Sequence, residues 1–502
     1  MLGFGLSGLV ALLFALGSTG IAQGQQVRRK YPRYFPGARW EIAYGAYDGV
    51  ERFAVDELQR LAQTSFPYVI DTEPASGVKP EDQEHLILAG TEQDNWLLRD
   101  LIGKGILRRP AGPQGYSIAC FDSPWKKGQR VIALAGSDPN GVLYGVEDFN
   151  AQIVKKALTR EEFDLIANFA MNETPAIQNR GIWCWGYVIY DYRRFFDHMA
   201  RLKMNTIIFW SDFAPQNCRE VVEYAHSRGI RVILGFQWGY DIAGLDPTSP
   251  EHRRKMRDEV LATFKQEYRD LGMDGIYFQT FTENSNLTIK GKSTAEWACL
   301  WVNEISSAIF KIAPKIRIEF GLHATSIRDR YVDLKPLDPR IVITWEDAGT
   351  LPYTYDPVTP DLASFDATVE YSKKLAIFRS NPEFSMVAKG WIQLPWRTSE
   401  HHPPYILGER DPEWIRQRLA QRQDRWDFVN PLWMKNYPLA AKFYRAVLAV
   451  HPSVCSVTGL IDDGEFEERI QPSVALFAQT LWNPSLPDSE ILKRALSPYY
   501  TR

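Results

Sequence analysis

The second half of the chain repeats one hydrophobic pattern, in which a short continuous apolar run precedes a longer stretch with helical apolar spacing. Continuous runs of Val, Ile and Phe indicate strands that are buried on both faces, as in parallel sheets. Such strands are expected over 181–185, 206–210, 231–236, 275–279, 316–320, 341–345, 385–392 and 456–461. This alternation predicts an α/β fold, a (β/α)8 TIM barrel with loop insertions. A doubly wound sheet is disfavoured because no glycine fingerprint follows the first strand.

The first part of the chain has a mixed pattern instead. Strands are expected over 40–44, 85–90, 116–121 and 130–134, and helices over 50–62 and 141–151. These elements predict a small mixed α/β domain over residues 23–175. The polar, Pro-containing segment 171–176 is expected to connect it to the barrel. The barrel, with its C-terminal closing helices, is then expected to occupy residues 176–502.

The beginning of the chain differs in composition from the rest. Residues 9–16 form an apolar run, and Gly20, Ile21 and Ala22 offer small residues for cleavage. This pattern is typical of a secretory signal peptide, here over residues 1–22, although no Lys or Arg precedes the run. We therefore expect an exported protein, secreted or periplasmic. After cleavage we expect no membrane association, because no later segment approaches about 18 uninterrupted apolar residues.

Charge and cysteine content exclude several classes of function. The 58 Lys and Arg residues nearly balance the 61 Asp and Glu residues, so the net charge of -3 gives no reason to bind nucleic acid. The 5 cysteines are sparse and form no CxxC or zinc-spaced cluster, so we expect buried free thiols and no metal. No phosphate loop is found, and no GxSxG follows a strand. We expect no cofactor, and the oligomeric state is left open.

The aromatic content, 13% of the chain, changes the picture when it is placed on the predicted barrel. Active sites of such barrels form at the carboxyl ends of the strands. The candidate binding residues at these ends are Trp183, Trp185, Trp210, Asp212, Trp238, Tyr240, Asp241, Gln279, Asn284, His323, Trp345, Lys389 and Trp391. Aromatic rings stack on the apolar faces of sugars, while amides and carboxylates bind the hydroxyl groups. The sequence therefore predicts a carbohydrate site at this end of the barrel.

Carboxylates at the same strand ends supply the chemistry for glycosidic cleavage, which needs a proton donor and a second carboxylate. Glu283 suits the donor, because partial burial in its Thr- and Phe-containing loop would raise its pKa. Glu346 and Asp347 suit the second role, with Asp212 and Asp241 in reserve. We expect the fourth and sixth strands to face each other across the mouth. That gap admits a water molecule and favours inversion of configuration.

Two segments resemble known glycosidases. Residues 136–149, Gly-Ser-Asp-Pro-Asn-Gly-Val-Leu-Tyr-Gly-Val-Glu-Asp-Phe, resemble the end of the small domain that precedes the barrel in family 67 α-glucuronidases and family 20 hexosaminidases. Residues 179–183, Asn-Arg-Gly-Ile-Trp, resemble the first strand of the family 20 barrel, in which the Arg contacts substrate hydroxyls. The resemblance implies that role for Arg180.

The two families differ in their catalytic carboxylates, and this sequence can be compared with each. Family 20 has an Asp before its catalytic Glu, to orient the substrate's N-acetyl group, whereas Thr282 precedes Glu283 here. A donor Glu after the fourth strand with carboxylates from later strands looks more like family 67.

We therefore expect an exported glycoside hydrolase, exo-acting on a plant or algal glycan and similar to α-glucuronidases. Arg180 and Lys389 are candidates to pair with a sugar carboxylate. The alternatives are a β-N-acetylhexosaminidase-like enzyme, a non-catalytic carbohydrate-binding barrel, and a polysaccharide lyase with Tyr or His as base.

Overall fold

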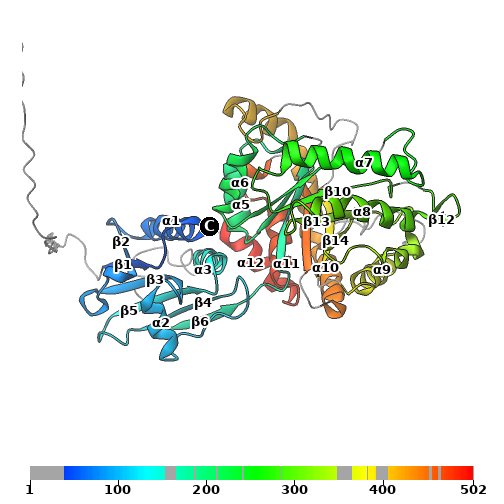
Figure 1. Ribbon diagram of the computed structural model, residues 1–502. Helices are drawn as coiled ribbons and strands as arrows, with labels where there is room; N and C mark the ends of the chain where they lie inside the picture. Colours follow the sequence, from blue (N-terminus) through cyan, green and yellow to red (C-terminus); the bar gives the residue numbers. More distant parts are fainter. Residues whose placement is uncertain are drawn as a thin grey trace, which may run out of the picture. The chain divides into compact units, whose positions relative to one another are not determined.

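Two large β-sheets and one two-stranded sheet, formed by β11 (Thr288–Ile289) and β12 (Lys292–Ser293), are present in the described part of the computed structural model (Figure 1). The structure describes residues 39–152, 166–185, 188–210, 213–239, 242–283, 285–346, 364–380, 383–391, 405–451, 455–461 and 465–500. The expected signal peptide, residues 1–22, lies outside these described residues.

The larger sheet is a closed barrel of eight parallel strands, in the order β10-β13-β14-β15-β16-β7-β8-β9. Its strands are β7 (Asn179–Trp185), β8 (Thr206–Trp210), β9 (Arg231–Gly235), β10 (Gly275–Phe278), β13 (Arg317–Leu322), β14 (Ile341–Trp345), β15 (Phe384–Trp391) and β16 (Cys455–Ile461). Each overlaps an expected strand, because continuous apolar runs are buried on both faces in a barrel. The predicted fold class, a TIM barrel preceded by a small mixed α/β domain, is confirmed.

Helices surround the barrel, as the repeated pattern predicts. They are α5 (Tyr192–Arg201), α6 (Cys218–His226), α7 (Pro250–Thr263), α8 (Thr294–Phe310), α9 (Phe365–Ile377), α10 (Pro412–Val450), α11 (Pro472–Trp482) and α12 (Asp488–Tyr500). Side-chain hydrogen bonds to backbone N–H groups determine where two of these helices begin. Ser293 and Glu296 form a reciprocal capping box at α8, and the Asp191 carboxylate accepts hydrogen bonds from two backbone N–H groups at α5. Helix α10 was not expected, since it contains Pro431 and Pro438.

The smaller sheet has six strands in the order β2-β1-β3-β5-β4-β6. They are β1 (Trp40–Tyr44), β2 (Asp71–Pro74), β3 (His85–Thr91), β4 (Tyr116–Asp122), β5 (Arg130–Gly136) and β6 (Phe169–Glu173). Helices α1 (Gly49–Ser65) and α3 (Pro139–Gln152) share one apolar core with this sheet, and α2 (Trp96–Gly103) belongs to the other core. Strand β6 pairs with β4 where the connector 171–176 was expected, and this pairing satisfies backbone N–H and C=O groups of both strands.

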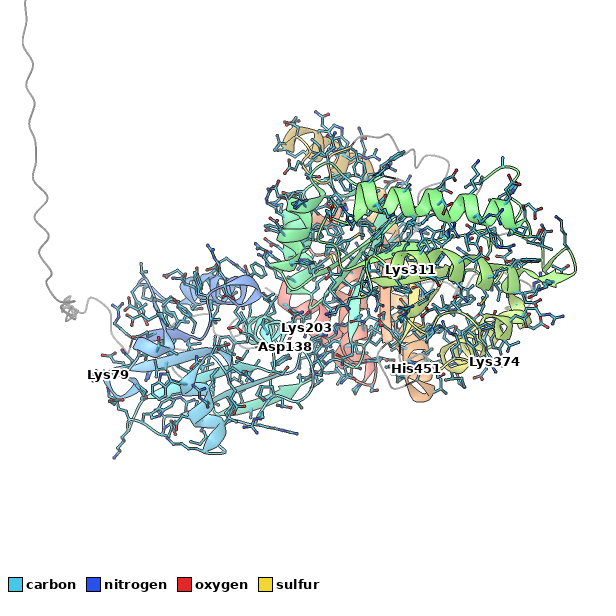
Figure 2. The ribbon with its side chains drawn as sticks, viewed as in Figure 1. Lys79, Asp138, Lys203, Lys311, Lys374 and His451 are labelled. Atoms are coloured by element: carbon cyan, nitrogen blue, oxygen red, sulfur yellow. The ribbon has the colours of Figure 1, made fainter. Side chains whose placement is uncertain are left out.

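The small domain packs on the part of the barrel where the strands begin. Trp482 of α11 belongs to the small domain's core and stacks on Tyr116, with ring centroids 5.9 Å apart. The Lys203 ammonium, labelled in Figure 2, lies 2.6 Å from the Asp148 carboxylate of α3. Arg201 forms a second ion pair, at 3.0 Å, with Glu57 of α1. These buried contacts leave the carboxyl ends of the strands on the side away from this junction.

Within the described ranges, no helix has both the length and the apolar character needed to cross a membrane.

Candidate active site

Four neighbouring strands bring polar side chains together at the carboxyl end of the barrel. Glu283 follows β10, His323 follows β13 and Glu346 follows β14, while Lys389 lies within β15. Because β10, β13, β14 and β15 are consecutive in the barrel, these side chains are spatial neighbours. The sequence analysis predicted all four as site residues, and the structure places them in one cluster.

Glu346 is the buried centre of this cluster, with only 3% of its side chain exposed. Its Oε1 accepts hydrogen bonds from the Tyr277 hydroxyl and from the Gln279 amide, the latter at 2.9 Å. Its Oε2 lies 3.5 Å from the Lys389 ammonium and 3.5 Å from His323 Nε2. A buried carboxylate needs such donors and cations to offset the cost of desolvation. The carboxylate is thereby held in one orientation.

Tyr277 and Gly321 are parts of this arrangement that the sequence analysis missed. Burial, together with the nearby Glu346 charge, raises the pKa of Tyr277 well above its usual value, so the phenol keeps the proton that it donates. A Cβ atom on Gly321 would overlap both the Tyr277 hydroxyl and Glu346 Oε1. The signal available for Tyr277 was its position within a strand, two residues before Gln279 and therefore on the same face.

Glu283 is the more accessible carboxylate, with 42% of its side chain exposed, which is more than the expected partial burial. Its Oε2 lies 4.0 Å from His323 Nε2, the same nitrogen that faces Glu346. One imidazole therefore lies between the two carboxylates. The expectation that they face each other across the mouth is wrong, because only β13 separates β10 from β14. Inversion stays a prediction, which now depends on Thr282 beside Glu283 being unable to polarise an N-acetyl group.

An aromatic cluster adjoins these polar residues. Trp183 stacks on Trp210 with centroids 6.4 Å apart, and Trp185 meets Trp183 edge-on at 5.1 Å. The Tyr277 ring contacts Trp183 and Trp210 edge-on, at 5.9 and 5.7 Å. Tyr277 therefore joins the aromatic cluster to the Glu346 carboxylate. The three predicted indoles of β7 and β8 lie beside the acidic cluster but are 2–8% exposed, so their role as a stacking surface for a sugar stays a prediction.

Three other predicted indoles point away from the mouth, which corrects their assignment as binding residues. The Trp345 indole donates to Ser372 of α9, since it precedes inward-facing Glu346 and alternate strand residues face opposite sides. Trp391 lies two residues after Lys389, but the strand register shifts between Ala388 and Trp391, and its indole donates to Ser473 of α11. The Trp238 ring stacks on Phe278 at 3.8 Å, and its backbone carbonyl accepts a hydrogen bond from the Trp301 indole of α8 at 2.8 Å.

Arg180 is also placed differently from the expectation. It lies at the beginning of β7, at the opposite end of the barrel, and is 1% exposed. Its guanidinium donates to the Lys203 carbonyl at 2.7 Å and to Gln114 at 2.9 Å. A residue at the amino end of a strand cannot reach the mouth, so Arg180 leaves the predicted substrate-binding set.

Five predicted residues, Asp212, Tyr240, Asp241, Asn284 and Asp347, lie outside the described residues. In the part of the chain that the structure describes, no group of three or more His, Cys, Asp or Glu side chains is placed to hold a metal ion. The five cysteines are free and buried.

The described cluster can hold and move protons. It contains one buried, multiply hydrogen-bonded carboxylate and one accessible carboxylate, with an imidazole between them. Two carboxyl groups in unlike environments are the arrangement used where one group must donate a proton while the other stays ionised.

Comparison with known proteins identifies the fold. No protein-family model matches the chain, and no curated protein sequence matches it. Among solved structures, it is similar to a glycoside hydrolase family 138 enzyme targeting the pectin rhamnogalacturonan II, at 13% identity and a TM-score of 0.50. The match covers 90% of this chain and 52% of that enzyme, so the chain spans about half of its length.

A second similar structure is the family 84 protein CpGH84B, at 11% identity and a TM-score of 0.51, over 91% of this chain and 70% of that one. A family 20 exo-β-N-acetylglucosaminidase from Vibrio harveyi matches with a TM-score of 0.45, which is too low to carry an argument. The expected distant resemblance to barrel glycosidases is confirmed at the level of the fold.

Proposed function

We propose that the chain is a glycoside hydrolase that acts at the carboxyl end of the barrel, with Glu283 as proton donor. The observation that carries this proposal is the pair of carboxylates, 42% and 3% exposed, on either side of His323 and beside an aromatic cluster. The two similar structures with TM-scores of 0.50 and 0.51 have the same fold and belong to glycoside hydrolase families.

The exposure of each group sets its proposed role. Glu283 can approach a glycosidic oxygen from the solvent side, as a donor must. Glu346 cannot move easily, because Tyr277 and Gln279 hold one of its oxygens and Lys389 faces the other. A fixed anion at this position stabilises the positive charge that develops at the anomeric carbon, or activates a water. Asp347 stays a prediction for that second role.

The proposed substrate is an acidic plant or algal glycan, attacked from its end by an exported enzyme. Lys389 supports an acidic sugar, since its ammonium is 15% exposed beside Glu346. Thr282 argues against the hexosaminidase alternative, because its hydroxyl supplies no charge to orient an N-acetyl group. N-terminal sequencing of the exported protein tests the export part; a chain that begins at Met1 would contradict it.

The experiment is a screen of glycan libraries and aryl glycosides with the wild type, Glu283→Gln and Glu346→Gln. The exposed residue Glu267, in the helical segment Phe264–Tyr268 that precedes β10, provides the matched control Glu267→Gln. Both site variants should lose about 10²–10⁴-fold in turnover of the natural glycan, while the control should not. Wild-type turnover by Glu283→Gln, or binding without any turnover by the wild type, would overturn the proposal; the latter would indicate a binding barrel.

A further inference from the structure

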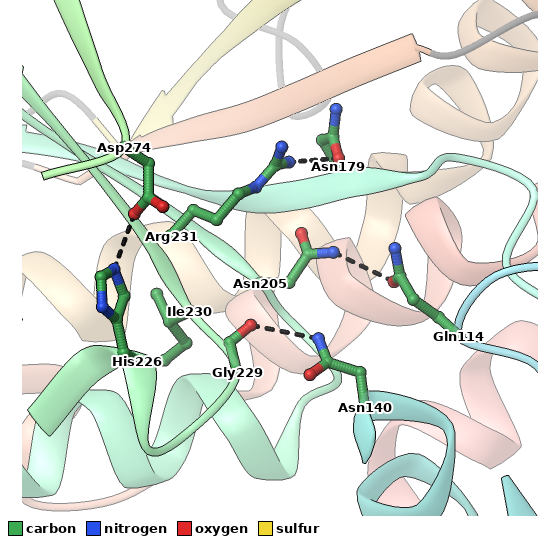
Figure 3. A pocket seen from close by; sticks show the side chains of 9 residues that line it. All are labelled: Gln114, Asn140, Asn179, Asn205, His226, Gly229, Ile230, Arg231 and Asp274. Carbon is green, nitrogen blue, oxygen red and sulfur yellow. Dashed lines mark hydrogen bonds and ion pairs between the residues drawn. The ribbon is translucent and has the colours of Figure 1, made fainter. Parts of the chain in front are cut away.

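A second cavity lies at the other end of the barrel, where the strands begin and the small domain packs (Figure 3). Its volume is about 430 Å³. The barrel contributes Asn179, Asn205 and Arg231, which lie at or beside the first residues of β7, β8 and β9. The small domain contributes Gln114 and Asn140. This volume is in the range of pockets that hold small molecules.

The walls of this cavity are fixed by hydrogen bonds between the two domains. The Asn140 amide donates to the Gly229 carbonyl at 3.1 Å, and the Asn205 amide donates to Gln114 Oε1 at 3.0 Å (Figure 3). The rim carries His226 and Asp274, whose side chains are 42% and 30% exposed and 2.8 Å apart. The cavity is therefore prearranged, polar and accessible from one side.

Gln114 has an unusual backbone for its position in this wall. Its φ angle is 61°, in the left-handed region that non-glycine residues seldom adopt. Its backbone N–H donates to Asp138 at 2.7 Å, and its side-chain amide donates to the Gln178 carbonyl at 3.0 Å. A strained conformation held by several contacts is frequent at ligand sites.

The Arg231 guanidinium has donors that the described residues do not use. Arg231 uses Nη2 to donate to Asn179 and Thr206, whereas its Nε and Nη1 have no hydrogen-bond partner among the described residues. Arg180, linked to Gln114, donates only to carbonyl and amide oxygens in the described part of the chain. Burial lowers the pKa of Arg180 to about 10, and the nearby Arg231 charge adds to this effect.

The other cations nearby form ion pairs, and the charges of Glu383, Glu319 and Asp274 act on Arg231 from beyond ion-pair distance. Arg317 forms ion pairs with Glu319 and Glu383, and Lys203 forms one with Asp148. At the rim, the Asp274 carboxylate faces His226 and accepts the Val232 N–H at 2.8 Å. Arg231 thus lines the cavity without a carboxylate within ion-pair distance in the described residues, whereas Arg180 is not a lining residue and is joined to the lining residue Gln114 by a hydrogen bond.

We propose that this cavity binds a small oxyanion, a carboxylate or phosphate group, through Arg231 and the surrounding amides. Donors in a rigid, partly desolvated pocket favour an anion with several acceptor oxygens, and a planar guanidinium matches such groups in particular. Because both domains line the cavity, a bound anion would also stabilise their junction. This site is separate from the carboxylate cluster at the mouth and does not depend on the proposed function.

The test is calorimetric titration of the full chain, at constant ionic strength, with sodium phosphate and with sodium glucuronate. Glucose and sodium chloride serve as the neutral and monatomic controls. Saturable binding of phosphate supports the site. An acidic sugar is also proposed to bind at the mouth, so glucuronate binding supports this cavity only where Arg231→Gln or Asn140→Asp weakens it. Binding should also raise the melting temperature. No saturable binding of either compound would overturn the proposal.

Two variants locate the binding. Arg231→Gln removes the charge, and we expect affinity to fall by about tenfold or more. Asn140→Asp is nearly isosteric and adds a negative charge to the opposite wall. It lies in the first turn of α3, where a carboxylate is favourable, so it keeps the proposal testable if Arg231→Gln does not fold.

Arg219→Gln, an exposed position on α6, is the matched control and should bind as the wild type does. Circular dichroism verifies the fold of each variant. Unchanged affinity in folded Asn140→Asp, or an equal loss in Arg219→Gln, would overturn the assignment of binding to this cavity.

Discussion

Buried carboxylates are compensated differently at the two ends of the barrel. At the amino end, Arg317 lies 2.6 Å from Glu319 Oε1 and 2.6 Å from Glu383 Oε1, and Asn179 donates to Glu383 at 2.8 Å. At the mouth, the buried Glu346 faces the Lys389 ammonium and the His323 imidazole, each at 3.5 Å. Short, geometrically matched pairs fix structure, while a carboxylate with looser cationic contacts can still respond to a substrate.

The comparison suggests that the same kinds of residue serve stability at one end and chemistry at the other. At the amino end, burial alone would raise the pKa of Glu383, but its contacts with Arg317 and Ser456 outweigh burial and lower it. The stabilisation from a lowered pKa is present above the ordinary glutamate value and is lost as the pH falls through the folded value. The amino end should therefore contribute to acid denaturation.

The largest effect on stability is expected for Arg317→Met. The change leaves two buried carboxylates without their cation and should lower the free energy of unfolding by about 3–5 kcal/mol. Urea denaturation at pH 7 measures it. Stability of the variant should also depend less on pH below the ordinary glutamate pKa, because Glu383 loses the contact that lowers its pKa. A loss below about 1 kcal/mol would show that this network is not a stability centre.

Glu346→Gln should separate activity from stability at the other end. We expect turnover to fall by about 10²–10⁴-fold, since the fixed anion is lost. The free energy of unfolding should fall by only about 1–2 kcal/mol, because Lys389 can be hydrated at the mouth. Steady-state kinetics and urea denaturation on the same preparations give both values. A loss of stability as large as that of Arg317→Met would contradict the proposed division between the ends.

The smallest stability change tests how tightly the Glu346 cluster is packed. Gly321→Ala inserts a methyl group against Tyr277 and Glu346, and we expect a cost of about 1 kcal/mol or somewhat more, with a measurable loss of activity. Gly103→Ala is the control, because a Cβ atom there meets nothing within 4 Å. Thermal denaturation and kinetics of both variants provide the test. Equal behaviour of the two would show that the Tyr277 contact does not position Glu346.

The barrel was largely predictable from the sequence, because strands buried on both faces leave continuous apolar runs. Helix α10 was not predictable, because it contains Pro431 and Pro438 and proline normally ends a helix. The packing that allows both prolines inside this helix cannot be deduced from the sequence. Strand β6 was missed because it overlaps the Pro-containing segment 171–176 and because its pairing with β4 is a tertiary effect.

The site was predictable in its polar residues and less so in its aromatic ones. The positions of four residues near the carboxyl ends of predicted strands were enough to select them, because barrel topology brings these ends together. They are Glu283, His323, Glu346 and Lys389. The direction of a side chain depends on alternation along the strand, which could have excluded Trp345 once Glu346 was placed inward. The register shift that turns Trp391 outward could not be predicted from the sequence.

The central claim is that Glu283 protonates the leaving group, and the dependence of rate on leaving-group acidity tests it most directly. A series of aryl glycosides of the sugar that the screen identifies should be hydrolysed by the wild type and by Glu283→Gln. The wild type should show a shallow dependence of kcat/KM on leaving-group pKa, because the enzyme supplies the proton. The variant should show a steep dependence and recover rate with the most acidic phenols. Parallel lines for the two proteins would contradict the assignment of Glu283 as the acid.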